Sequence, residues 1–241
     1  QKRELIYSYL AKGYADAVAA HEISILQFMK DYGFEFRILE EPLEAVELGV
    51  AFSRSLKVMR FGDNMRNVAV TEGDKVEVQR KLGWQVNTWA VGDLVKEINA
   101  VTEAEIDALM DVYREKYDFA TDDIAAIRYQ AREELAIQHM LDAEGAEAFS
   151  NTFQDLYGMR QLPGLASQNL MANGYGYGGE GDWKVSAMTR IIKAMTQGMP
   201  GGTPFMEDYT YNLVPGKEGI LEAHMLEVCP TIADGPISIK V

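Results

Sequence analysis

Two carboxylates and one imidazole, in three separate segments, are the side chains in this sequence best suited to chemistry. Glu180 lies in a glycine-rich stretch, Glu207 follows Phe-Met, and His224 precedes Met-Leu-Glu-Val-Cys-Pro. Each has strand-like or glycine-rich sequence around it, so each can project from the end of an element into a common cleft. Such ligands suit a divalent ion such as Mn, Mg or Zn, and carboxylates can also move protons on carbon next to a carbonyl.

The glycine-rich stretch around Glu180 has three interpretations. Its glycines match the dinucleotide-binding fingerprint, with Gly176, Gly178 and Gly181 at the three required positions. Glu180 and Asp182 would then stand beside a pyrophosphate at a helix N-terminus, where the site should attract anions. The stretch could instead be an ordinary turn before a helix, or a bend so sharp that Glu180 faces a cleft. The two acidic residues favour the last interpretation.

Glu207 has an ordinary structural explanation as well as a functional one. An isolated acid in an alternating strand usually faces water. Here alternation puts Glu207 on the face that carries three aromatic side chains, Phe205, Tyr209 and Tyr211. A carboxylate in such a place is partly desolvated, which is costly without a purpose. We therefore favour a functional role for Glu207.

His224 is one of three histidines, with His21 and His139. A lone histidine on a strand is more often a hydrogen-bonded structural residue than a metal ligand. Alternation gives His224 the same face as Leu226 and Val228, so its ring points toward apolar surroundings, although histidine is also the commonest metal ligand. We expect His139 and His21 to be structural.

The elements that must position these residues alternate between helix and strand up to about residue 200. Hydrophobic spacing predicts helices over residues 1–31, 43–54, 74–82, 102–116, 122–143, 165–172 and 183–196. Alternating patterns predict strands over residues 34–39, 56–61, 84–91 and 148–153. Thr102 and Asp182 are candidate N-caps for two of the helices. The alternation implies an α/β fold, a parallel sheet flanked by helices.

A domain boundary is predicted at residues 198–204, which contain two Pro and three Gly. Beyond it the helical period disappears, and residues 205–213, 220–228 and 236–241 are expected to be strands. The predicted organisation is therefore an α/β lead-in over residues 1–55, a central α/β domain over 56–200, and the start of a β-rich C-terminal domain over 201–241.

Composition excludes several classes of function. The 241 residues carry a formal net charge of -14, which disfavours binding to nucleic acid and to anionic membranes. No stretch reaches the roughly 18 apolar residues of a membrane-spanning helix, and we expect no signal peptide. The single cysteine, Cys229, rules out an internal disulfide and fits a reducing cytoplasm. The chain starts with Gln1 rather than Met, and we expect both ends to belong to something longer.

Several motifs together resemble the L-arabinose isomerase family. In chain order they are RFGDNMR at residues 60–66, VTEGDKV at 70–76, VGDL at 91–94, LPGL at 162–165, GEGDWK at 179–184, FMEDY at 205–209 and HMLEVCP at 224–230. The resemblance runs from about residue 56 to residue 241, with the motifs in the family's order. Residues 1 to about 50 do not obviously resemble the family.

The resemblance implies a fucose/arabinose isomerase-like fold and the aldose–ketose isomerisation of L-arabinose to L-ribulose, usually with Mn²⁺, with Mg²⁺ or Co²⁺ as alternatives. It implies that Glu180 and Glu207 bind the metal and shuttle a proton between sugar carbons through an enediol. His224 matches a metal ligand of the family.

The resemblance also implies a set of residues around this site. Asp182, Phe205, Tyr209 and Glu227 match residues near the metal, and Met65 lies in a motif that faces the sugar. Ordinary packing explains these five about as well. The family's fourth ligand, a second histidine far downstream, is absent from this sequence, as is its recognisable N-terminal domain. The resemblance further implies a cytoplasmic homo-oligomer, a tetramer or hexamer.

Three other functions stay open at this point. The first is isomerisation of another sugar, such as L-fucose or D-galactose, because pocket shape sets that choice. The second is a truncated, catalytically inactive chain that acts only as an assembly domain. The third is an NAD-binding domain, which the glycine pattern alone supports.

Overall fold

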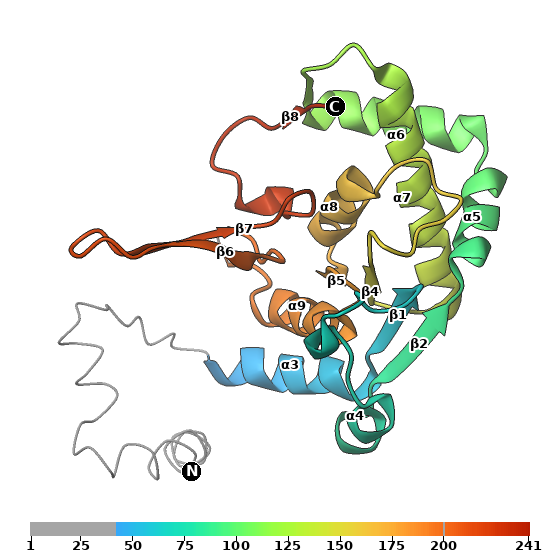
Figure 1. Ribbon diagram of the computed structural model, residues 1–241. Coiled ribbons are helices and arrows are strands. Elements are labelled where there is room, and N and C mark those ends of the chain that lie inside the picture. Colours follow the sequence, from blue (N-terminus) through green and yellow to red (C-terminus); the bar gives the residue numbers. More distant parts are fainter. Residues whose placement is uncertain (1–41, 200) are drawn as a thin grey trace, which may run out of the picture. The chain divides into compact units, whose positions relative to one another are not determined.

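The computed structural model describes residues 42–199 and 201–241, and residues Leu48–Val241 form one compact unit. Its centre is a parallel sheet with the strand order β2-β1-β4-β5 (Figure 1). The strands are β1 (Lys57–Phe61), β2 (Gln85–Trp89), β4 (Ala148–Asn151) and β5 (Gly176–Gly178). The predicted α/β fold with a parallel sheet flanked by helices is confirmed.

Helices lie along the sheet and close its two faces (Figure 1). They are α3 (Pro42–Ser55), α4 (Lys75–Leu82), α5 (Val91–Ala100), α6 (Glu103–Lys116), α7 (Ile124–Glu144), α8 (Gly164–Ala172) and α9 (Trp183–Met195), with short 3₁₀ turns η1 (Ala69–Thr71) and η2 (Pro230–Ile232). No helix of residues 42–199 and 201–241 has the length and apolar character needed to cross a membrane.

The core is divided by the sheet into two clusters, as the alternation of strand side chains requires. Val58 and Ala148 pack with Trp183 and Ile191 of α9 on one face. Met59, Phe61, Phe149 and Tyr177 pack with α5, α6, α7 and α8 on the other face. β1, β4 and β5 are largely buried, whereas the residues of the edge strand β2 are exposed or half-buried. The loops after the carboxyl ends of these parallel strands gather at one edge, where α/β sheets bind ligands.

Several predicted strands were misplaced. Strand 84–91 ends at Trp89 because Val91 begins the unpredicted helix α5. The stretch 176–181 was interpreted as a sharp bend, but the bend occupies only residues 179–182, and Gly176–Gly178 is the strand β5. An added Cβ would lie 2.2 Å from the Ser186 carbonyl oxygen at Gly176 and 2.7 Å from that of Asp182 at Gly178. These glycines therefore let α9 approach the sheet, which explains the pattern without a dinucleotide.

The C-terminal strands are shorter than predicted. They are β6 (Glu207–Asn212) and β7 (Gly219–Ala223), which form an antiparallel hairpin, and β8 (Ser238–Ile239), which pairs in parallel with the unpredicted β3 (Asp118–Phe119). His224 lies beyond β7, so the predicted alternation with Leu226 and Val228 is wrong. His224 and Glu227 approach to 2.6 Å, and residues three apart cannot meet on an extended strand.

The hairpin β6–β7 also differs from the prediction in its exposure. Tyr209 and Tyr211, which were expected to enclose Glu207, are 53% and 50% exposed. The ladder shifts register between Asp208 and Thr210. Phe205 alone of the predicted aromatic face is buried, at 5% exposed. The predicted helix over residues 1–31 and strand over 34–39 lie outside the described residues.

Candidate active site

Glu180 stands on a tight turn at the carboxyl end of β5. The Asp182 amide donates to the Gly179 carbonyl at 2.9 Å, and both central residues have positive φ, 62° at Glu180 and 78° at Gly181. This is the signature of a type I′ turn. A positive φ is unfavourable for a glutamate and tends to occur where function requires it. Asp182 then caps α9 by accepting from the amides of Lys184 and Val185.

Loops after two other strands hold this turn in place. The Met65 amide donates to the Glu180 carbonyl at 2.8 Å, and the Gly181 amide donates to the Asn151 carbonyl at 2.8 Å. An added Cβ at Gly181 would lie 2.5 Å from the Asn64 Cα, so the contact admits only glycine. Met65 therefore lies beside the Glu180 turn.

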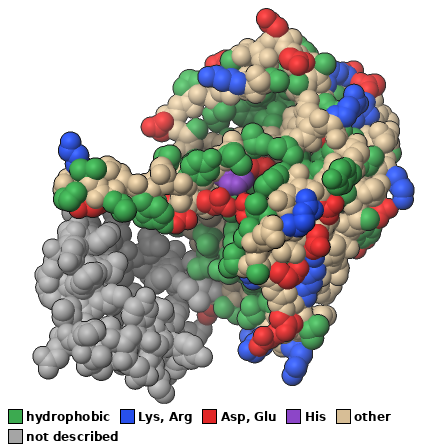
Figure 2. Space-filling model, in the orientation of Figure 1, with side chains coloured by type: hydrophobic (Ala, Val, Ile, Leu, Met, Phe, Trp, Pro, Cys, Tyr) green, Lys and Arg blue, Asp and Glu red, His purple; other side chains and the backbone are tan. Residues whose placement is uncertain are grey.

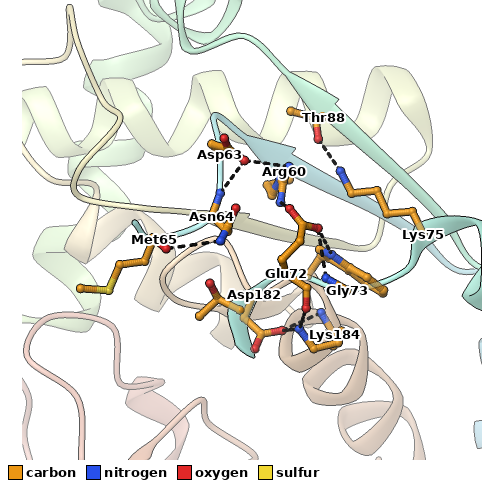
Figure 3. A network of polar contacts seen from close by, with 12 residues as sticks. Arg60, Asp63, Asn64, Met65, Glu72, Gly73, Lys75, Thr88, Asp182 and Lys184 are labelled. Carbon is orange, nitrogen blue, oxygen red and sulfur yellow. Dashed lines mark hydrogen bonds and ion pairs between the residues drawn. The ribbon is translucent and has the colours of Figure 1, made fainter. Parts of the chain in front are cut away.

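A polar network behind the turn fixes the loop that follows β1 (Figure 3). Arg60 is buried, and its guanidinium lies 2.8 Å from Glu72 and 3.2 Å from Asp63. Burial acts to raise the pKa of Glu72, but hydrogen bonds from Arg60 and Gly73 outweigh it and lower that pKa to about 2. Lys184 donates to the Glu72 carbonyl at 2.5 Å, which ties the network to α9.

His224 is fixed by a carboxylate on one side and an aromatic ring on the other. Its Nδ1 lies 2.6 Å from Glu227 Oε2, and both side chains are largely buried. The contact is an ion pair, and Nδ1 makes no regular hydrogen bond. The Phe205 ring meets the imidazole edge-on, with centroids 4.7 Å apart. Nε2 faces the Glu180 turn, because an added Cβ on Gly179 would lie 3.5 Å from it.

Charge links Glu180, Glu207 and His224. Burial raises the pKa of Glu180, the negative charge of Glu207 raises it further, and His224 acts in the opposite direction. Burial acts to lower the pKa of His224, but Glu227, Glu207 and Glu180 outweigh burial and raise it. Acidic side chains surround a histidine on the face drawn in Figure 2. The two predicted catalytic glutamates and the predicted metal ligand His224 thus lie close enough for their charges to interact.

A cavity of about 150 Å³ lies at this place and is lined by Glu180, His224 and Glu227, with Asn151, Tyr177 and Gly179. Glu207 is half-buried at the start of β6 and is not part of this lining. A larger cavity of about 600 Å³ between α7, α8 and β8 contains none of the predicted site residues. The smaller cavity is therefore the candidate active site.

The predicted ligands do not form a compact metal cluster. Within residues 42–199 and 201–241, no three side chains of His, Cys, Asp or Glu are grouped closely enough to hold an ion. Tyr209 is exposed on the hairpin, and His139 pairs with Glu97 at 3.1 Å on the surface, as expected for a structural histidine. His21 lies outside the described residues.

Three residues of the site escaped the sequence analysis. Tyr177 and Asn151 line the cavity, and Arg60 organises the loop beside it. The usable signal for Arg60 was a charge between two apolar residues of a strand, Met59 and Phe61. Tyr177 stands between two glycines, which have no side chains. The alternation of apolar and polar residues that would have predicted its burial is therefore missing from the sequence.

Comparison with known families agrees with the motifs. Residues 57–198 match the model of the L-arabinose isomerase central domain, and residues 202–241 match that of the C-terminal domain. The chain is 55% identical over 192 residues to an L-arabinose isomerase of Nocardioides sp., covering 77% of this chain and 38% of the relative.

Two further relatives extend this similarity. An L-arabinose isomerase of Thermotoga sp. (strain RQ2) is 54% identical over 198 residues, covering 81% of this chain and 40% of the relative. An L-arabinose isomerase of Shouchella clausii is 58% identical over 182 residues, covering 75% of this chain and 37% of the relative. The chain thus spans about two fifths of the length of the curated relatives it matches.

Proposed function

Because the chain belongs to the L-arabinose isomerase family, we propose that it contributes to an aldose–ketose isomerase site that converts L-arabinose to L-ribulose. The observation that carries the proposal is a cavity at the carboxyl edge of a parallel sheet, lined by Glu180 and His224, whose pKa values respond to each other's charge and to that of Glu207. Neighbouring carboxylates with unlike environments can divide the roles of acid and base.

In the proposed reaction the two glutamates move protons. One carboxylate removes the proton from C2 of the open-chain sugar, the electron pair forms the C1–C2 double bond, and the carbonyl oxygen on C1 takes up a proton. A proton then returns to C1 while the hydroxyl on C2 loses its proton and becomes the carbonyl. The raised pKa of Glu180 makes its carboxylate a better proton acceptor than that of a free glutamate.

We propose that Glu180, Glu207 and His224 would hold a divalent metal, with Mn²⁺ preferred and Mg²⁺ or Co²⁺ as alternatives. The donor set fits such an ion, since Glu227 occupies Nδ1 of His224 while Nε2 faces the Glu180 turn. When bound, the ion would polarise the sugar oxygens. Its binding requires the three side chains to draw closer than they now lie.

Further properties of the whole protein belong to the same proposal. We propose a sugar as the small-molecule partner, no nucleic acid or membrane partner, a cytoplasmic location, and a homo-oligomer, a tetramer or hexamer. The strongly acidic net charge of -14 supports the exclusion of nucleic acid. Phe205 packs against the ring of His224, and Glu227 pairs with its Nδ1. We propose that Met65, Asp182 and Tyr209 lie near the bound sugar or metal.

The experiment is ketose formation from L-arabinose with Mn²⁺, with chelator, and in the variant Glu180→Gln. Turnover that requires both Mn²⁺ and Glu180 would support the proposal, and L-fucose and D-galactose in parallel would reveal a different sugar preference. Glu144→Gln, an exposed acid at the end of α7, is the matched control and should leave turnover unchanged.

A catalytically inactive assembly domain is the second candidate function. The absence of a grouped metal site within residues 42–199 and 201–241 favours it. A folded chain without turnover and without Mn²⁺ binding would select this candidate over the isomerase.

A further inference from the structure

Tyr177 is a buried tyrosine that the proposed reaction does not use. It is 1% exposed in the middle of β5, and its ring packs against Phe149 at 5.1 Å and edge-on against Phe205 at 5.6 Å between centroids. Phe205 in turn packs on His224. The aromatic contacts fix the ring, but they do not explain a hydroxyl in this place, because burying an unpaired hydroxyl is unfavourable.

The Tyr177 hydroxyl lies among polar groups that line the candidate site. It donates a long hydrogen bond of 3.3 Å to Asn151 Oδ1. Glu227 lines the same cavity. Burial raises the pKa of Tyr177 far above its usual value, and the charge of Glu227 and a hydrogen bond to it raise it further. A phenol has one proton, and a carboxylate is a stronger acceptor than an amide oxygen.

The carboxylate of Glu227 needs a hydrogen-bond donor such as the Tyr177 hydroxyl. Its side chain is 9% exposed, and its recorded close contact is with Nδ1 of His224. A buried carboxylate is costly unless several donors satisfy its oxygens. As a neutral donor to Glu227, the Tyr177 hydroxyl would stabilise the carboxylate without competing with the imidazole for its charge.

Resting on the proposed metal-dependent function, we propose that Tyr177 is a positioning residue: its hydroxyl holds Glu227 so that the carboxylate keeps the proton of His224 on Nδ1. Nε2 is then left with its lone pair directed toward the Glu180 turn. A carboxylate that fixes the tautomer of a ligating histidine in this way makes the ring a better ligand. Tyr177 acts through Glu227 and touches neither metal nor sugar.

The test is the tautomer of His224 in Tyr177→Phe, which keeps the ring and its packing. In ¹⁵N-histidine-labelled protein the chain has only three imidazoles, so His21→Gln and His139→Gln assign the signal of His224. Spectra at about pH 9 report the neutral ring. We expect one tautomer, protonated on Nδ1, in the wild type and a mixture in Tyr177→Phe.

Tyr175→Phe is the matched control, because that hydroxyl donates to Asp142 at 2.6 Å away from the site. It should leave the tautomer unchanged. Titration with MnCl₂ alone gives a second readout, with roughly 10-fold weaker binding expected in Tyr177→Phe and none of this loss in Tyr175→Phe. An unchanged tautomer in Tyr177→Phe overturns the positioning role, whatever the metal does.

The outcomes separate this inference from the proposed function. A wild type that binds no Mn²⁺ would refute the metal proposal, while the tautomer would still decide the role of Tyr177. Should Tyr177→Phe fail to fold, a crystal structure of the wild type decides instead. A phenol oxygen about 2.5–2.8 Å from the Glu227 carboxylate supports the role, and one beyond about 3.5 Å overturns it.

Discussion

Glu134 should make the protein less stable as the pH rises, and Glu134→Gln should remove that effect. Its side chain lies on α7 and is 3% exposed. The Tyr113 hydroxyl donates to it at 2.5 Å and the Asn169 amide at 2.8 Å, while the Tyr117 hydroxyl donates to Asn169 at 2.6 Å. Burial raises the pKa of Glu134 from 4.5 to about 7, against these hydrogen bonds.

The direction of this pH dependence follows from whether the folded or the unfolded protein binds the proton of Glu134 more tightly. Between pH 4.5 and about 7 the folded protein keeps Glu134 protonated while the unfolded chain has lost that proton. The stabilisation is therefore complete below pH 4.5 and disappears as the pH rises through about 7. At about 1.4 kcal/mol for each pH unit in this window, the loss between pH 5 and 8 is about 2 to 3 kcal/mol.

The assay is urea unfolding at several values between about pH 5 and pH 8, followed by tryptophan fluorescence. Glu134→Gln replaces the acid with a neutral group of the same shape, so its free energy of unfolding should fall by about 2 kcal/mol less over this range than that of the wild type. Glu133, whose pKa burial raises to about 9, remains in both proteins and cancels in the comparison.

Equal pH dependence in the wild type and Glu134→Gln would refute the reasoning. It would mean that Glu134 ionises in the folded protein as easily as in the unfolded chain, despite its burial. Glu144→Gln removes an exposed acid from the same helix and should leave the pH dependence as it is.

Three smaller perturbations test other parts of the fold. Gly181→Ala should lower the free energy of unfolding by about 3 kcal/mol, because the new Cβ would lie 2.5 Å from backbone atoms. Gly174→Ala is the control: its φ is also positive, at 102°, but the space around it is open, so it should lower the free energy of unfolding by only about 1 to 2 kcal/mol. Thermal unfolding of the two variants compares these effects. Arg60→Met should cost about 1 to 3 kcal/mol in urea at neutral pH. It should also reduce the stability that Glu72 contributes above pH 4.5 and loses toward its pKa of about 2, while the hydrogen bonds from Gly73 and Trp183 remain; equal acid sensitivity would contradict this. Thr102→Ala removes the capping box of α6 and should cost about 1 kcal/mol by calorimetry, and no change would mean that packing alone holds that end.

The start of a helix was predictable from the local sequence where a side chain caps its N-terminus. Thr102 forms the predicted capping box, and Asp182 caps α9 as expected. The beginning of α5 lacks such a signal, because its N-cap, Ala90, makes no side-chain bond. The helix is held by burial of Val91, Leu94 and Ile98 instead, and burial is a property of the folded chain.

The bend at the candidate site was predictable from local sequence, but the arrangement of the side chains around it was not. The glycines around Glu180 indicated a sharp bend, and the bend is there. The turn after β7 was missed because it depends on the pairing of His224 with Glu227, which local alternation cannot reveal. β3 and β8 were beyond prediction since each has two residues and they pair across more than a hundred positions of sequence.

The left-handed backbone of Glu180 sets stability against the proposed activity. Glycine would fit a φ of 62° without strain and would remove a carboxylate whose ionisation burial opposes. Glu180→Gly is thus expected to raise the melting temperature while abolishing turnover. Selection for thermostability alone would replace this glutamate with glycine, whereas selection for the proposed activity would keep it.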